Sequence, residues 1–134
     1  MIALDSAILV DILSDQPDSV ASDQALRVAL AAGPVVACDV VIAEVCSSFV
    51  NSDDLFDVLS NLGVQYSPVE MKSAVRAGEM QRRYRQRHGN LARTVPDFIV
   101  GAHALLQCDG LITRDNGFFR DYFKGLKVIV PKPH

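Results

Sequence analysis

Residues 1–6 read M-I-A-L-D-S, and residues 7–13 continue with A-I-L-V-D-I-L. The short apolar run at residues 2–4 is typical of a buried parallel strand, and residues 7–13 have the apolar spacing of a helix. A strand that leads directly into a helix favours an α/β fold, in which the two kinds of element alternate. The opening therefore predicts the fold class, and it places Asp5 where the first strand ends.

The alternation of strands and helices continues along the chain. Further strands are predicted at residues 35–38, 64–67, 110–113 and 127–130, and further helices at residues 18–32, 39–49, 53–61, 69–88 and 96–108. Strands that alternate with helices pair in parallel, with helices on both faces of the sheet. The sequence thus predicts a central parallel sheet of about five strands flanked by helices.

Length and composition indicate one globular domain that spans residues 1–134. The chain is 49% hydrophobic and 22% charged, which is enough apolar material for a core. No apolar run approaches the roughly 18 residues of a transmembrane helix, and the start lacks the basic region of a signal peptide. We therefore expect a cytoplasmic protein with no membrane partner.

The cysteines and histidines show no pattern of metal ligands. The number of cysteines is odd and no C-x-x-C pair occurs, so buried free thiols are expected rather than a zinc site or disulfides. We expect structural or exposed roles for the histidines as well. These residues are Cys38, Cys46, Cys108, His88, His103 and His134.

Four acids lie where predicted strands meet predicted helices: Asp5, Glu44, Asp97 and Asp115. Asp5 and Asp115 come just after strands, and Asp97 opens the helix that leads to the strand at residues 110–113. Glu44 lies about one turn into the helix after the second strand. Because the carboxyl ends of parallel strands meet at one edge of a sheet, we expect all four acids to converge there.

Single acids of this set also have structural interpretations. Asp5 could cap the helix that follows it, Asp97 could favour the dipole of its helix, and Asp115 could begin a turn at Asn116-Gly117. Glu44 is harder to explain in this way, because it sits in an apolar stretch that contains three valines and a phenylalanine. All of the structural interpretations would have to hold at once for the convergence to carry no function.

Carboxylates at the edge of an apolar core lose hydration, and this loss is unfavourable unless something pairs with them. Four of them without four basic partners indicate a bound cation, and the oxygen ligands favour Mg²⁺ or Mn²⁺. We expect Asp5, Asp97 and Asp115 to be metal ligands, Asp115 either directly or through a water molecule, with Glu44 acting through a water molecule or orienting the nucleophile. Such a site in a small α/β domain points toward phosphoryl chemistry.

A basic segment occupies residues 76–93, where six arginines stand against one acid, Glu79. The segment therefore has a net charge of +5 and leaves −8 for the rest of a chain whose total is −3. One interpretation is a solvated helix face in which Glu79 pairs with an arginine one turn later. The excess of arginine favours contact with nucleic-acid phosphates instead. The candidate phosphate-binding residues are Arg82, Arg83, Arg85, Arg87 and Arg93.

Four segments, taken in order, resemble the PIN domain family, and within it the VapC-type toxins of bacterial toxin–antitoxin pairs. They are I-A-L-D-S with I-L-V-D-I-L, V-V-I-A-E-V, V-P-D-F-I-V-G-A-H-A-L and L-I-T-R-D-N-G-F-F. The resemblance covers essentially the whole chain, and it is specific in the order and separation of the segments. It implies a PIN-like domain that acts as a magnesium-dependent endoribonuclease. It also implies a homodimer that is inhibited by a cognate VapB-like antitoxin, with RNA as the partner of the arginines.

Within this resemblance, the four acids fall on the acidic quartet of the family. Ser6 falls where a Ser or Thr often supports the first acid, and Thr113 and Arg114 match a common T-R before the last acid. Two positions depart from the family pattern. Asp39 stands next to Cys38 where a small hydroxyl residue is frequent, so it is either a fifth carboxylate or has no role. Asn116 takes a position that is sometimes acidic, which leaves a further ligand there open.

Three other functions remain open at this stage. A non-catalytic PIN-like module that binds RNA or protein would be expected to have lost an acid. A phosphoacceptor receiver domain would need paired acids after the first strand, where Asp5 stands alone, and an acceptor acid after the third strand, which ends in Ser67-Pro68. A nuclease that acts on DNA is also open, because no residue is recognisable as a reader of the RNA 2′-hydroxyl.

Overall fold

The computed structural model describes residues 1–15, 17–48, 52–88 and 93–132. Five strands form one sheet in the order β3-β2-β1-β4-β5, and every neighbouring pair is parallel. The predicted α/β class and five-stranded parallel sheet are therefore confirmed. The strands are β1 (Ile2–Leu4), β2 (Val35–Ala37), β3 (Val64–Tyr66), β4 (Gly110–Ile112) and β5 (Val128–Ile129).

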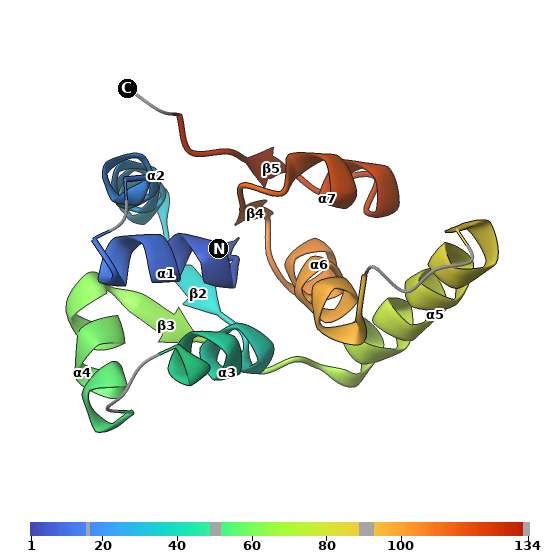
Figure 1. Ribbon diagram of the computed structural model, residues 1–134, viewed down its shortest axis with the longest axis horizontal. Helices are drawn as coiled ribbons and strands as arrows, with labels where there is room; N and C mark the ends of the chain where they lie inside the picture. The colour runs from blue at the N-terminus through green and yellow to red at the C-terminus, as the bar shows by residue number, and fades with distance from the viewer. Residues whose placement is uncertain (16, 49–51, 89–92, 133–134) are drawn as a thin grey trace.

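Helices surround this sheet, with α1 to α4 around the half that contains β1 to β3 and α5 to α7 around the other half (Figure 1). The longest helix of the described chain, α5, extends well beyond the sheet. The helices are α1 (Ser6–Leu13), α2 (Ser19–Ala32), α3 (Asp39–Ser47), α4 (Asp53–Leu62), α5 (Met71–His88), α6 (Val95–Gln107) and α7 (Asn116–Tyr122).

The last of these helices was not predicted. Sequence analysis assigned no element between the strands ending at residue 113 and beginning at residue 127, whereas the structure has α7 there. The segment N-G-F-F-R-D-Y spans only two turns and opens with Asn and Gly, which favour a turn. Its helix is stabilised by packing instead, because Phe118 and Phe119 are both buried.

The direction in which successive strands are added to the sheet reverses between β1 and β4, which makes this position a switch point of the sheet. The chain moves from β1 outward to β2 and β3, and then returns to pair β4 with the other side of β1. The register places Ala3 opposite both Val36 and Leu111. In open α/β sheets, ligands bind outside the carboxyl ends of the strands at such a switch point. Asp5 and Asp115 follow the two strands that flank it.

The core between the sheet, α6 and α7 is aromatic. Phe98 and Phe123 are 0% and 1% exposed, and Phe98 meets Phe118 edge-on with ring centroids 5.2 Å apart. Gly101 faces the Phe123 ring so closely that a methyl group there would come within 2.6 Å of Cζ. The packing of α6 against α7 therefore depends on a glycine one turn after Phe98.

The structure also describes His103 and the three cysteines, for which the sequence predicted no metal ligation. His103 is buried and hydrogen-bonded through Nε2 to the Ser67 hydroxyl at 2.9 Å, and its pKa is lowered by burial. Its predicted structural role is confirmed. All three cysteines are free, with Cys38 buried and Cys46 and Cys108 partly buried.

Within the described ranges, no helix combines the length and apolar character needed to cross a membrane.

We expect Gly101→Ala to lower the free energy of unfolding by about 2–3 kcal/mol, because the added methyl group overlaps the Phe123 ring and a packed core adapts poorly to extra volume. Urea denaturation would measure the change. The matched control is Gly78→Ala in α5, where an added methyl group meets nothing within 4 Å. It should be neutral or stabilising by up to about 1 kcal/mol. Equal effects of the two substitutions would contradict this account of the α6–α7 contact.

Candidate functional site

Asp5 and Asp115 are linked through Thr113 at the carboxyl edge of the sheet. The Thr113 hydroxyl donates a hydrogen bond to Oδ2 of Asp5 at 2.7 Å, and it accepts one from the backbone N–H of Asp115 at 3.0 Å. Oδ1 of Asp5 accepts from the backbone N–H of Ser6 at 2.8 Å, so Asp5 also caps α1. The two acids that follow the neighbouring strands β1 and β4 are thus held by one buried hydroxyl group.

Asp97 comes to the same edge from the first turn of α6. Its carboxylate accepts a hydrogen bond from the backbone N–H of Thr94, the residue that precedes the helix, at 3.2 Å. This contact fixes the acid and stabilises the start of the helix together. Structural roles for Asp5 and Asp97 therefore coexist with their convergence on one edge and do not replace it.

The electrostatics show that these carboxylates are close to one another. Burial raises the pKa of Asp5 above its ordinary value, hydrogen bonds from Thr113 and Ser6 oppose this rise, and the charges of Asp97 and Asp115 add to it. Burial also raises the pKa of Glu44, and the charges of Asp5 and Asp97 reinforce the effect. Electrostatic interactions thus connect Asp5 with each of the other three acids that sequence analysis singled out.

Glu44 differs from the expectation in one respect. The sequence suggested that it lies on the apolar face of its helix, but this was wrong, because Val41 and Val45 take the buried face of α3 and Glu44 is exposed. Phe49, which was part of the same argument, lies outside the described residues. Burial still raises the pKa of Glu44, while a hydrogen bond from the Ser6 side chain lowers it. Glu44 therefore borders the site from the solvent side.

Arg93 lies in the site itself. Its Nη1 donates to Oδ2 of Asp115 at 2.5 Å, and its guanidinium lies over the Phe118 ring, 4.3 Å from the centroid. The hydrogen bond to Asp115 raises the pKa of Arg93, and the charges of Asp115 and Asp97 contribute to the rise. Sequence analysis grouped Arg93 with the arginines of the preceding helix, whereas the structure places it against a candidate metal ligand.

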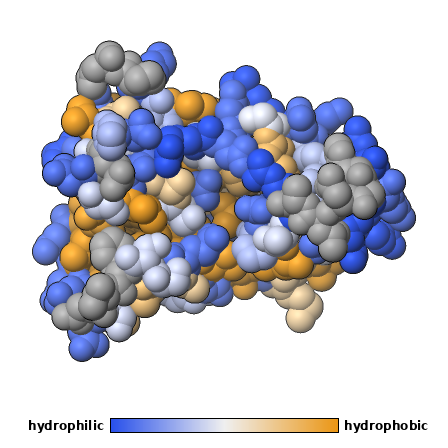
Figure 2. Space-filling model, viewed as in Figure 1, coloured by the Kyte–Doolittle hydropathy of each residue, from blue (hydrophilic) through white to orange (hydrophobic). Residues whose placement is uncertain are grey.

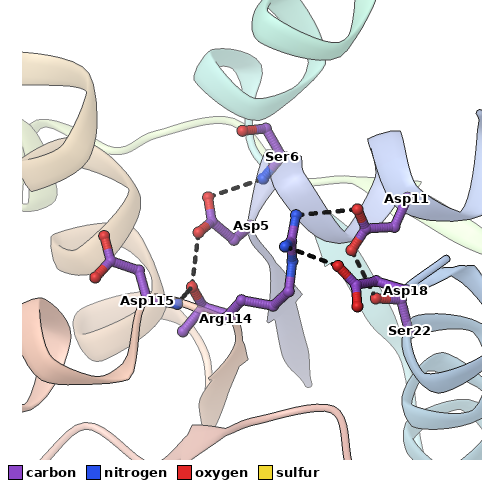
Figure 3. A network of polar contacts seen from close by, with 8 residues as sticks. Asp5, Ser6, Asp11, Asp18, Ser22, Arg114 and Asp115 are labelled. Atoms are coloured by element: carbon purple, nitrogen blue, oxygen red, sulfur yellow. Dashed lines mark hydrogen bonds and ion pairs between the residues drawn. The ribbon is translucent and has the colours of Figure 1, made fainter. Parts of the chain in front are cut away.

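Arg114 points to the opposite side of the strand end (Figure 3). It donates to Asp11 at 3.0 Å and to Asp18 at 3.1 Å, so that the β4–α7 turn is tied to α1 and to the start of α2. Asp11 is only 3% exposed and also accepts a hydrogen bond from Ser22 at 2.9 Å. In this position Arg114 supports the site by holding the backbone between Thr113 and Asp115.

Asp11 was missed by sequence analysis, although a signal was present. It is the one acid in the apolar segment A-I-L-V-D-I-L, and a buried carboxylate in such a helix needs a polar or charged partner. Arg114, 103 residues away in the chain, supplies that partner. A search for a basic residue predicted at the same edge of the sheet would have suggested this pair.

The remaining candidate phosphate-binding arginines are exposed on α5, at the end of the molecule that Figure 2 shows as hydrophilic. In the described part of this helix, Glu79 forms no ion pair with Arg82 or Arg83, so the interpretation as a self-paired helix face is not supported. A cavity of about 540 Å³ lies beside the helix and is lined by Arg76, Arg83, Arg87 and Lys124 among others. Nothing in the structure places this basic surface directly on the acids.

The donor set at the acid site fits a divalent cation in its chemistry. Carboxylate and amide oxygens are the ligands that Mg²⁺ and Mn²⁺ take in proteins. Next to Asp115, Oδ1 of Asn116 is buried and has no hydrogen-bond partner, which is unusual for a polar atom. Across residues 1–15, 17–48, 52–88 and 93–132, however, no three Asp, Glu, His or Cys side chains are already gathered as a group that could hold a metal ion. The site thus has suitable ligands in an open arrangement.

The comparison with protein families agrees with this geometry. Residues 2–124 match the family described as the PIN domain. The chain belongs to the PIN domain family. Within the PIN fold, the acids of this chain follow β1 and β4 and open α6, as the sequence segments had indicated. The predicted family is therefore confirmed over nearly the whole chain.

Several solved structures share the fold at low sequence identity. VapBC2 from Rickettsia felis, bound to a DNA fragment from its promoter, has a TM-score of 0.74 at 20% identity, with 97% of this chain and 98% of that chain covered. A toxin–antitoxin complex from Klebsiella pneumoniae has a TM-score of 0.67 at 22% identity, with both chains covered completely. FitAcB from Neisseria gonorrhoeae has a TM-score of 0.64 at 21% identity and 98% coverage of both chains. The comparison with curated proteins returned no match.

We expect Asp11→Ala to lower the free energy of unfolding by about 2 kcal/mol, because it removes the buried partner of Arg114 and leaves the Ser22 hydroxyl unsatisfied. Asp18→Ala is the matched control. It removes the second carboxylate on the same guanidinium, but Asp18 is 55% exposed, and exposed pairs contribute under about 1 kcal/mol. Urea denaturation of both variants would test this. A larger effect of Asp18→Ala would contradict the role given to Asp11.

The stability of the metal-free protein should depend on pH through Asp5. Its pKa is raised in the folded state, so the folded state binds the proton more readily than the unfolded state does. Ionised Asp5 therefore opposes folding at neutral pH, and this penalty disappears as the pH falls through the raised pKa toward the ordinary value of 3.8. In the presence of EDTA, the free energy of unfolding of Asp5→Asn should increase relative to that of the wild type as the pH rises from about 4 to about 7.

Denaturant unfolding at several pH values would measure the difference between Asp5→Asn and the wild type. The change of this difference with pH is the informative quantity, because any altered hydrogen bonding to Thr113 contributes equally at each pH. A difference that stays constant across the range would show that the Asp5 carboxylate carries no penalty in the folded protein.

Proposed function

We propose that this PIN domain is a Mg²⁺- or Mn²⁺-dependent endoribonuclease and the toxin of a toxin–antitoxin pair. The observation that carries the proposal is the convergence of Asp5, Asp97 and Asp115 at the switch point of the sheet. Burial raises the pKa of Asp5, and the charges of Asp97 and Asp115 add to the rise, so an ion of opposite charge would stabilise the ionised carboxylate.

Asp5, Asp97 and Asp115 would hold the metal ion, and the unpartnered Oδ1 of Asn116, the residue after Asp115, is a further candidate ligand. Such an ion, when bound, supplies a more acidic water molecule and positive charge next to a phosphate. Thr113 keeps the Asp5 carboxylate oriented, and the Thr94 N–H does the same for Asp97. Glu44, at the exposed side of the site, orients the attacking water for in-line hydrolysis. The products are a 5′-phosphate and a 3′-hydroxyl.

The basic surface of α5 supports nucleic acid as the substrate. Its arginines are exposed, and phosphate contacts by arginine supply most of the sequence-independent affinity for a nucleic-acid backbone. RNA is favoured over DNA by the resemblance of the four sequence segments to the VapC-type toxins. Arg82, Arg83, Arg85 and Arg87 would hold the RNA backbone while the acids act on one phosphodiester bond.

The toxin role is supported by the proteins that share the fold. VapBC2 from Rickettsia felis and the complex from Klebsiella pneumoniae are toxin–antitoxin structures that match this chain over 97% and 100% of its length. By this analogy the chain has a VapB-like antitoxin partner and forms a homodimer. The activity of the toxin would then be controlled by the antitoxin and not by the site alone.

Purified, antitoxin-free protein should cleave RNA in the presence of Mg²⁺ or Mn²⁺ and not in EDTA. Asp97→Asn should reduce cleavage by at least about a hundredfold, because it weakens a charged ligand while Asn retains an acceptor for the Thr94 N–H. Asp57→Asn, on the exposed face of α4, is the matched control and should cleave like the wild type. Cleavage ends mapped on total RNA would carry a 5′-phosphate.

An active Asp97→Asn protein would contradict the assignment of the site. A folded wild type that binds RNA without cutting it under either metal would instead favour a non-catalytic PIN-like binding module. Metal-dependent cleavage of single-stranded DNA at the rate of RNA would keep the site and change the substrate.

A further inference from the structure

Arg93 is fixed in the acid site by two independent contacts. On one side it forms the 2.5 Å ion pair with Asp115, in which the side chains are 31% and 38% exposed. On the other side the guanidinium lies 4.3 Å from the centroid of Phe118, a buried ring in the helix that Asp115 directly precedes. An arginine held between a carboxylate and an aromatic face has lost much of the freedom of an exposed side chain.

The position of Arg93 in the chain couples it to a second acid. It directly precedes Thr94, whose backbone N–H is hydrogen-bonded to Asp97. The charges of both Asp115 and Asp97 contribute to the raised pKa of the guanidinium. The guanidinium is thus in contact with Asp115 and is also influenced by the charge of Asp97.

The other acids of the site have no such partner. In the part of the chain that the structure describes, the ion pairs include none that involves Asp5, Glu44 or Asp97. Arg114, although adjacent to Asp115 in sequence, directs its charge to Asp11 and Asp18 on the far side of the strand end (Figure 3). Among the described residues, Arg93 is therefore the guanidinium that offsets part of the charge of the site.

We propose that Arg93 is the resident counter-cation of the acid site, and that a divalent metal ion must compete with its guanidinium for Asp115 in order to bind. The guanidinium of Arg93 and a metal ion bound at Asp115 are both positively charged and would repel each other. The contact that stabilises the metal-free protein therefore weakens its affinity for metal. The inference rests on the proposed function, since it takes Asp115 as a metal ligand. It adds that the chain itself sets the metal concentration at which the site fills.

Mn²⁺ titration of metal-stripped protein by calorimetry tests this without any substrate. Arg93→Met removes the charge and keeps an unbranched side chain over Phe118, and it should lower the Kd for Mn²⁺ by about three- to tenfold. Arg93→Lys keeps the charge but loses the stacked guanidinium, so its Kd should lie between those of the wild type and Arg93→Met. The matched control is Arg27→Met, which breaks an Arg–Asp pair of 2.7 Å on α2, away from the acids, and should leave the Kd unchanged.

The contact with Asp115 predicts a coupled effect. In an Asp115→Asn background, Arg93→Met should improve Mn²⁺ affinity by less than it does in the wild type. An equal gain in both backgrounds would overturn the assignment of Asp115 as the shared carboxylate. Melting curves in EDTA establish that each variant is folded, and Arg93→Gln replaces Arg93→Met if the latter does not fold.

The remaining outcomes separate this inference from the proposed function. If the wild type binds Mn²⁺ and Arg93→Met binds it with equal or lower affinity, the competition is refuted and the nuclease assignment stands. If no variant binds Mn²⁺ at millimolar concentration, both the competition and the metal site are refuted.

Discussion

The burial of a carboxylate near other carboxylates at one edge of a parallel sheet is the constraint on which the function of this protein depends. The fold brings Asp5, Asp97 and Asp115 to this edge from three different elements, where burial raises the pKa of Asp5 and the charges of Asp97 and Asp115 add to the rise. Arg93 compensates only part of this charge, through Asp115. A site of this kind opposes folding slightly and favours any small cation that can enter it.

The rest of the structure can be understood as support for this unfavourable arrangement. Thr113 holds Asp5 and the backbone of Asp115, and Arg114 anchors the following turn to the buried Asp11. The aromatic contact between Phe98 and Phe118 holds α6 against α7. Asp97 lies in α6, and Asp115 directly precedes α7. Each acid is therefore positioned by hydrogen bonds and packing that do not require a metal.

The sequence was sufficient for those parts of the structure that depend on local pattern and on strand topology. Apolar runs at β1, β2 and β4 predicted a parallel sheet, and acids at their carboxyl ends predicted a convergent site. The helix α7 was missed because its N-G start favours a turn, and burial of its phenylalanines, a tertiary effect, decides its structure. The exposure of Glu44 was misjudged because a nine-residue helix with several valines does not show which side faces the core.

Contacts between distant parts of the chain were not predicted. The pairs Asp11–Arg114 and Arg93–Asp115 join residues 103 and 22 positions apart, and each depends on the orientation of a side chain. Sequence analysis assigned Arg93 to RNA because it follows a run of arginines, yet α6 begins two residues later and turns it toward the acids. Charge that looks surplus in a sequence can thus be part of the site.

The most direct test of the account is a crystal structure of the protein soaked with Mn²⁺, with the ion located by its anomalous scattering. The account predicts a strong anomalous peak bounded by the carboxylates of Asp5, Asp97 and Asp115, with the Arg93 guanidinium moved away from Asp115. The absence of a peak at this edge under saturating Mn²⁺, or a peak held by other residues, would contradict the central claim that these acids form a metal site.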